Sequence, residues 1–259
     1  MICAGMDAGS RTVKLILWDS ERQRVIGRGR VEQGTDQNRR AHDLFREVLA
    51  NSGLSASDVR RTIATGYGRH LIDFADTTVT EITCHARGVR FLIPDVRTVI
   101  EIGGQDSKVI KMTPEGTVRD FAMNDRCAAG TGRFLEMTAQ RLEMTLDDLA
   151  CLSTKSVNPA VISSMCVVFA ETEIVGLLAQ GTACEDIVAG VQRSIAERLL
   201  SMLGNKVDDP VVFTGGVATI PSMVRALQDV LERSVTTAPE PFYTGALGAA
   251  LLASVDKTQ

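Results

Sequence analysis

Several patterns that identify common metal and nucleotide sites are missing from the sequence. Its six cysteines form no Cys-x-x-Cys pair, so it contains neither a closed four-cysteine zinc pattern nor a ferredoxin pattern. There is no Gly-x-x-x-x-Gly-Lys-[Ser/Thr] motif, which excludes a Walker-type phosphate loop. The cysteines show no disulfide-framework spacing, which indicates thiols that are free or metal-bound in a reducing cytoplasm.

Other shortages limit the expected partners. Aromatic residues make up only 4% of the 259 residues, so a base-stacking surface is not expected. The net charge of −4 argues against nucleic acid as a partner. Apolar runs are short and interrupted, and the first residues begin a strand rather than a secretory signal, so no membrane segment is expected. A hydrophobic content of 44% is enough for one large core or two lobes.

A strand–turn–strand–turn–strand pattern occurs twice and indicates an internal duplication. The expected strands are 2–6, 13–18 and 24–31 in the first copy, and 98–102, 108–112 and 117–123 in the second. Further strands are expected at 61–65, 211–213 and near Val235, and helices at 36–51, before Pro94, and at 131–141, 146–152, 166–178, 184–203, 222–231 and 243–252. We expect an α/β fold with one lobe of residues 1–93 plus 240–259 and a second of 94–239.

Three glycine-rich turns, at 7–14, 103–107 and 214–217, follow strands of this pattern. Glycine lets the main chain approach a phosphate, and successive N–H groups form an anion-binding concavity. Each turn alone is a weak signal, but three in a duplicated pattern predict a nucleotide site. The candidate nucleotide-binding residues are Gly9, Ser10, Arg11, Thr12, Lys14, Gly103, Gly104, Gln105, Gly215, Gly216 and Val217.

Cys127 and Cys166 each stand where a helix is expected to begin. A thiolate there faces unpaired N–H groups and the positive end of the helix dipole. An anionic iron–sulfur cluster suits that environment. One chain offers two such ligands, so a four-thiolate cluster needs two more from elsewhere.

The remaining cysteines and the histidines are expected to be structural. Cys3, Cys151 and Cys184 are interpreted as small buried residues, and Cys84 beside His85 as structural because adjacent side chains point apart. The three histidines, His42, His70 and His85, are expected to form structural hydrogen bonds rather than to act in catalysis.

Four motifs, together with the segments around the two cysteines, resemble those of a known family. They are Asp7-Ala8-Gly9-Ser10, Thr65-Gly66-Tyr67-Gly68-Arg69, Glu81-Ile82-Thr83-Cys84-His85-Ala86 and Ile102-Gly103-Gly104-Gln105-Asp106-Ser107-Lys108. The chain is similar to the actin, heat-shock-70 and sugar-kinase ATPases and, within them, to the 2-hydroxyacyl-CoA dehydratase activators. The resemblance covers residues 3–252.

The resemblance implies a fold, an activity and partners. The fold is two RNase-H-like lobes with ATP in the cleft between them. The activity is ATP-dependent one-electron donation by a homodimer, whose single [4Fe-4S] cluster is held by Cys127 and Cys166 of both subunits. A low-potential ferredoxin or flavodoxin supplies the electron, and an iron–sulfur acceptor such as a 2-hydroxyacyl-CoA dehydratase receives it.

The resemblance also implies roles for individual residues in nucleotide binding and hydrolysis. Ser10, Thr12 and Lys14 are placed against the phosphates, and Gly215 and Gly216 in the nucleoside pocket. The catalytic candidates are Asp7 and Asp106, near Mg²⁺ or its waters, and Gln105, which is expected to orient the attacking water.

Two alternatives stay open at this point. Within the family, the chain is an ATPase subunit or reductase of a benzoyl-CoA-reductase-like complex or of another iron–sulfur partner. Outside it, the chain is a small-molecule (sugar) kinase of the same superfamily, a reading that leaves the cysteine pair unexplained.

Overall fold

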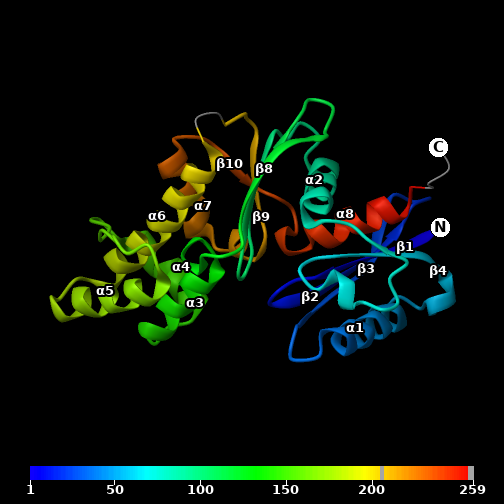
Figure 1. Cartoon of the computed structure of the whole chain (residues 1–259), viewed down its shortest axis with the longest axis horizontal. Helices are drawn as coiled ribbons and strands as arrows, with labels where there is room; N and C mark the ends of the chain where they lie inside the picture. Colours follow the sequence, from blue (N-terminus) through cyan, green and yellow to red (C-terminus); the bar gives the residue numbers. More distant parts are fainter. Residues whose placement is uncertain (205–206, 256–259) are drawn as a thin grey trace. The chain divides into compact units, whose positions relative to one another are not determined.

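The chain divides into two compact units (Figure 1). The computed structural model describes residues 1–204 and 207–255. Unit 1 comprises Met1–Val96, Met112–Arg119 and the C-terminal segment from Ala238, and unit 2 comprises Arg97–Lys111 and Asp120–Thr237. The predicted division places all of 94–239 in one lobe. The structure groups Met112–Arg119 with unit 1, where Arg90 donates a hydrogen bond to the carbonyl oxygen of Pro114.

Unit 1 is built on a five-stranded sheet with the strand order β3-β2-β1-β4-β5. Its strands are β1 (Ile2–Ala8), β2 (Thr12–Asp19), β3 (Arg24–Glu32), β4 (Val59–Thr65) and the short β5 (Thr77–Thr78). β1 pairs antiparallel with β2 and parallel with β4. The strands β1 to β4 confirm the predicted ones, whereas the two-residue β5 has too little periodic pattern to be predicted from sequence.

Helices cover both faces of this sheet. α1 (Gln37–Asn51) begins at its N-cap Asp36, whose carboxylate accepts from the N–H of Arg39. Leu15 and Leu17 of β2 pack with α1, whereas the alternate residues Ile16 and Trp18 pack with α8 (Thr244–Ala253). This alternation follows from the two-residue period of a strand. α2 (Glu81–Leu92) also packs against α8.

The contact between α2 and α8 depends on glycine, which gives a testable prediction. A β-carbon on Gly248 would collide with the carbonyl oxygen of Cys84 on α2. Because backbone cannot move aside as a side chain can, Gly248→Ala is expected to lower the free energy of unfolding by about 3 kcal/mol. Urea unfolding of the variant measures this loss.

Gly176→Ala is the matched control, since Gly176 also lies within a helix but a β-carbon there meets nothing within 4 Å. Alanine favours a helix over glycine by about 1 kcal/mol, so this variant is expected to be as stable as the parent or slightly more so. Equal stability of Gly248→Ala and the parent would show that α2 and α8 are not in this contact.

Unit 2 repeats the sheet of unit 1, with the strand order β10-β9-β6-β7-β8. Its strands are β6 (Thr98–Ile102), β7 (Ser107–Met112), β8 (Val118–Asn124), β9 (Val211–Thr214) and β10 (Val235–Thr237). β6 pairs antiparallel with β7 and parallel with β9, as β1 does with β2 and β4. Each strand from β6 to β10 thus has the place of its counterpart from β1 to β5, which confirms the predicted duplication.

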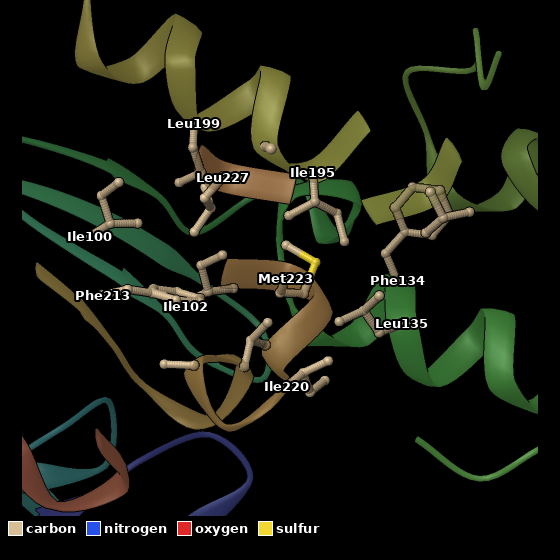
Figure 2. Close-up of a cluster of buried hydrophobic side chains, with 14 of the residues drawn as sticks. Ile100, Ile102, Phe134, Leu135, Ile195, Leu199, Phe213, Ile220, Met223 and Leu227 are labelled. Atoms are coloured by element: carbon tan, nitrogen blue, oxygen red, sulfur yellow. The ribbon is translucent and has the colours of Figure 1, made fainter. Parts of the chain in front are cut away.

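The core of unit 2 joins this sheet to its helices (Figure 2). The helices are α3 (Gly132–Arg141), α4 (Leu146–Leu152), α5 (Val167–Ala179), α6 (Cys184–Leu203) and α7 (Pro221–Leu231). Side chains from α6 and α7 meet Ile100, Ile102 and Phe213 of the sheet, and Phe134 and Leu135 bring in α3. Therefore α3, which follows Cys127, and β6, which leads to the glycine-rich turn at 103–107, share one core.

Six short 3-10 helices complete the described structure: Ala56–Asp58, Arg69–Leu71, Ala128–Gly130, Ser153–Lys155, Gly216–Thr219 and Pro241–Tyr243. In the part of the chain that the structure describes, no helix combines the length and apolar composition required to cross a bilayer.

Candidate functional site

The first glycine turn joins the C-terminal end of β1 to the N-terminal end of β2 in the unit 1 sheet. The N–H of Gly9 donates to the carbonyl oxygen of Thr12 at 3.1 Å and closes the turn. Asp7 and Lys14 lie opposite each other in the β1–β2 register, with 3.1 Å between Oδ2 and Nζ. Ser10 and Arg11 lie at the tip with accessible side chains. The predicted residues of this turn thus come together, while their roles toward a phosphate stay predictions.

A second segment supports this turn from β4. Gly66 has a φ of +95°, and a β-carbon there would lie 2.7 Å from Oδ1 of Asp7. The N–H of Gly68 donates to the carbonyl oxygen of Ala8 at 2.8 Å. These glycines belong to one of the motifs that resemble the family, but they were not predicted to be site residues.

The second glycine turn joins β6 to β7 in unit 2. The N–H of Gly103 donates to the carbonyl oxygen of Asp106 at 2.9 Å. The Lys108 ammonium lies 2.9 Å from Oε2 of Glu101 and 2.6 Å from Oδ2 of Asp106. Gln105 is exposed, so its amide is accessible to a ligand. Asp106, assigned to the Mg²⁺ region by resemblance, is in an ion pair with Lys108.

The residues that flank the two turns occupy equivalent positions in the two sheets. Asp7 faces Lys14 on the antiparallel neighbour and Thr65 on the parallel one, and Glu101 faces its partners in the same way. A glycine with positive φ follows each threonine. The equivalent sets are Asp7, Lys14, Thr65 and Gly66 in unit 1, and Glu101, Lys108, Thr214 and Gly215 in unit 2.

Glu101 and Lys108 are site residues that were not predicted from the sequence, although the duplication contains the signal for them. Aligning the two copies on their glycine turns places Glu101 at the position of Asp7, and Lys108 at that of Lys14. The third turn adds to the same group of residues, because a β-carbon on Gly215 would lie 2.6 Å from Oε1 of Glu101.

The segments that carry the two candidate cluster cysteines touch each other in unit 2. The thiol of Cys127 donates to the carbonyl oxygen of Met165 at 3.6 Å. Asn124 accepts from the N–H of Cys127 at 3.0 Å and donates to its carbonyl oxygen at 2.8 Å. Cys166 is exposed at the N-terminus of α5, where its carbonyl oxygen accepts from the N–H of Ala170.

Both cysteines stand directly before a helix, as expected, but the two helices differ in kind, because Cys166 precedes the α-helix α5 and Cys127 precedes only a short 3-10 helix. Cys127 precedes a 3-10 helix, Ala128–Gly130, and α3 begins only at Gly132. Thr131 separates the two because its backbone is extended and its hydroxyl caps the N–H of Arg133. A single 3-10 turn presents fewer aligned peptide dipoles than an α-helix.

Two charged side chains hold the Cys166 segment. Glu173 accepts hydrogen bonds from the N–H groups of Ser163 and Ser164, both at 2.9 Å. Partial burial raises the pKa of Glu173, but hydrogen bonds from these two serines outweigh it and lower the pKa to about 2. Arg198 of α6 donates to the carbonyl oxygen of Ser164 at 2.9 Å. Both the N–H groups and a carbonyl oxygen of the segment before Cys166 are therefore held by side chains of neighbouring helices.

Of the other cysteines, Cys3 and Cys84 are buried, as expected for structural residues. Burial raises the pKa of the Cys84 thiol to about 12, so it stays protonated at neutral pH and is a poor metal ligand. Cys151 contradicts the expectation of burial and is exposed. It lies on α4, whose buried contact with the core is made by Leu149 instead.

The histidines His85 and His42 form hydrogen bonds, as expected. His85 is buried, and its Nδ1 lies 3.0 Å from the hydroxyl of Thr244. A β-carbon on Gly245 would lie 3.1 Å from Nε2 of His85 and 3.2 Å from Oδ2 of Asp7, so both groups border the same space at the start of α8.

Within residues 1–204 and 207–255, no group of three or more His, Cys, Asp or Glu side chains is placed to hold a metal ion. The donors that the described chain offers at the cysteine segments are therefore two thiols. Their surroundings are apolar and open, since Met165, Val168 and Phe169 are 79%, 68% and 70% exposed.

Comparison with known proteins gives a consistent result. The model of the BadF/BadG/BcrA/BcrD ATPase family matches residues 4–253. The activator of lactoyl-CoA dehydratase from Anaerotignum propionicum is 44% identical over 256 residues, which are 98% of this chain and 97% of that protein.

Two solved structures are similar to this chain over nearly their whole length. Component A of the (R)-2-hydroxyglutaryl-CoA dehydratase of Acidaminococcus fermentans has a TM-score of 0.92 at 42% identity, covering 98% of this chain and 97% of that one. The activator of the 2-hydroxyisocaproyl-CoA dehydratase from Clostridium difficile, with bound ADPNP, has a TM-score of 0.91 at 39% identity, covering 98% and 94%. These likenesses confirm the predicted α/β fold class and the family resemblance.

Proposed function

The chain belongs to the BadF/BadG/BcrA/BcrD ATPase family, and from that premise we propose that it is an ATP-dependent one-electron donor. Its acceptor is an iron–sulfur enzyme, a 2-hydroxyacyl-CoA dehydratase or a relative. The names of the similar proteins, an activator of lactoyl-CoA dehydratase and an activator of 2-hydroxyisocaproyl-CoA dehydratase, support this choice.

One observation carries the proposal: the second glycine turn and the Cys127 segment are directly connected. The N–H groups of Gly132 and Arg133, at the start of α3, donate to the carbonyl oxygens of Gly103 and Gly104, both at 2.9 Å. Only the 3-10 helix and Thr131 separate Gly132 from Cys127. A shift of the second turn that accompanies nucleotide binding therefore moves the backbone that positions Cys127.

The nucleotide is proposed to bind through the three glycine turns. Ser10, Thr12 and Lys14 contact the phosphates, Gly103 and Gly104 present backbone N–H groups, and Gly215 with Gly216 and Val217 forms the nucleoside side. Asp7 and Asp106 are proposed to act on Mg²⁺ or its waters. ADPNP bound to the Clostridium difficile activator supports nucleotide binding by this family.

Cys127 and Cys166 are proposed to hold half of a [4Fe-4S] cluster, and the same pair from a second copy the other half. The two thiols on touching segments fit this role, and a two-fold homodimer doubles them to four. The exposed apolar residues Met165, Val168 and Phe169 beside Cys166 supply a surface suited to a second copy. When bound, the cluster supplies one-electron transfer.

The remaining partners follow from this role. A low-potential carrier, ferredoxin or flavodoxin, delivers the electron, and the reaction takes place in the cytoplasm. ATP shifts the protein toward its donating state only by binding that state more tightly, so the two nucleotide-linked states must differ at the turns described above.

The proposal is tested by anaerobic electron transfer with a Gln105→Ala variant. Dithionite-reduced protein with MgATP is expected to reduce a purified 2-hydroxyacyl-CoA dehydratase, measured by its iron–sulfur absorbance, and not to do so with ADPNP. Gln105→Ala is expected to slow ATP hydrolysis and electron transfer together by about 100-fold, because the water-orienting amide is lost. Its ATP affinity should stay within a small factor of the parent's.

Three other results would contradict the role of Gln105 or favour one of the alternative functions. Equal losses of affinity and turnover would make Gln105 a binding residue. A reduction of benzoyl-CoA reductase but not of the dehydratase would favour the benzoyl-CoA-reductase alternative. A colourless monomer that phosphorylates sugars would refute electron donation and favour a kinase.

A further inference from the structure

Lys108 has a buried ammonium group for which the proposed function gives no role. The side chain is 1% exposed, and its Nζ lies between Oε2 of Glu101, at 2.9 Å, and Oδ2 of Asp106, at 2.6 Å. A buried charge is tolerated when it is paired and hydrogen-bonded. Lysine reaches this position from β7, which begins directly after the second glycine turn.

The two carboxylates come from opposite ends of that turn. Glu101 lies on β6, before Gly103, and Asp106 lies after Gln105. The ammonium therefore connects the start and the end of the segment that contains Gly103, Gly104 and Gln105. The hydrogen bond from Gly103 to Asp106 closes the same turn through its backbone. Lys108 adds a charged connection between side chains to this backbone bond.

Unit 1 shows what is specific to this arrangement. Lys14 is the equivalent lysine and pairs with Asp7, the equivalent of Glu101. At the turn position of Asp106, however, unit 1 has Thr12, since Gly9 donates to Thr12 as Gly103 does to Asp106. The second carboxylate, and with it the connection across the turn, is confined to unit 2, where Gln105 stands beside it.

We propose that Lys108 is a positioning residue for ATP hydrolysis, which acts by holding Glu101 and Asp106 together and thereby fixing the turn that carries Gln105. Without the ammonium, two neighbouring carboxylates repel each other, the turn opens, and the amide of Gln105 leaves its position. The inference rests on the proposed placement of the nucleotide phosphates at this turn.

Lys108→Met tests the proposal, because methionine keeps the apolar stem and removes the charge. The kcat of ATP hydrolysis is expected to fall by about 100-fold, the effect of a misplaced reacting group, while ATP affinity measured by calorimetry changes by less than about tenfold. Lys111→Met is the control, since Lys111 lies on the same strand outside the site, and its kcat should match the parent's.

Chemical rescue separates positioning from a merely structural role. In Lys108→Ala, ethylammonium or butylammonium ions should restore part of kcat by occupying the space between the two carboxylates, whereas ethanol or butanol should not. If Lys108→Met does not fold, Lys108→Gln replaces it. Glutamine is polar but uncharged, so the two carboxylates still repel each other, and a lowered kcat with retained ATP affinity is again expected.

The results distinguish this inference from the proposed function. A slow Gln105→Ala variant with a parental kcat in Lys108→Met would overturn the inference and leave the turn assignment intact. Parental kcat in both variants would remove the assignment of this turn to hydrolysis. A parallel loss of ATP affinity and kcat in Lys108→Met, with no rescue by alkylammonium ions, would show that Lys108 only maintains the fold.

Discussion

Replacing Cys127 or Cys166 with serine is expected to abolish the iron–sulfur absorbance of anaerobically reconstituted protein. Both residues lie on touching segments of unit 2, and no third His, Cys, Asp or Glu joins them within the described chain. Loss of one thiol per chain removes two of the four thiolates of a shared cluster. Iron and sulfide analysis of each variant measures the loss, which should be close to complete.

Cys151→Ser is the matched control because Cys151 and Cys166 are both exposed. Exposure alone therefore does not distinguish them, and Cys151→Ser should retain the cluster, as should variants of Cys3, Cys84 and Cys184. The stoichiometry decides between models: about four irons per dimer fit a shared cluster, and about four per monomer would refute it.

The same variants should weaken the dimer. A metal site shared by two chains stabilises the assembly that presents its ligands, so gel filtration of Cys166→Ser at low concentration should show more monomer than the parent. The Cys151→Ser control should remain dimeric. A parental dimer in the absence of bound iron would show that the apolar residues around Cys166 are sufficient for association.

Strands and turns could be predicted from the sequence where their residue pattern is local. Alternating apolar residues and glycine turns predicted the strands of both copies, and the structure confirms them with equivalent strand orders. Cys127 shows the limit of this reasoning, because the 3-10 helix Ala128–Gly130 that follows it is too short to produce a periodic pattern. The exposure of Cys151 depends on which face of the short α4 is buried, and seven residues are too few to show it.

The pairing of side chains across strands was harder to predict. Glu101 and Lys108 are brought together by the β6–β7 register, which depends on the geometry of the turn between them. The duplication would have supplied that register, since Asp7 and Lys14 have the same relation in the first copy. The connection from Gly103 and Gly104 to α3 could not be read in this way, because it joins segments that are distant in sequence.

Gly215→Ala is expected to lower ATP affinity by about 100-fold, or about 2.8 kcal/mol at 1.4 kcal/mol per tenfold change. Gly215 has a φ of +90°, a conformation that alanine rarely adopts. A β-carbon there would collide with the carbonyl oxygen of Ile102 and lie 2.6 Å from Oε1 of Glu101. The third turn and the start of the second must therefore move apart, which disturbs two of the proposed nucleotide contacts.

Gly181→Ala separates backbone strain from collision. Gly181 has a similar φ of +80°, but a β-carbon there meets nothing within 4 Å, so this variant carries the strain without displacing a turn. Calorimetric titration with ADPNP should give a parental affinity for Gly181→Ala and a large loss for Gly215→Ala. Gly66→Ala, the unit 1 equivalent, should also lose affinity because its β-carbon would lie 2.7 Å from Asp7. Parental affinity in both Gly215→Ala and Gly66→Ala would place the nucleotide away from these turns.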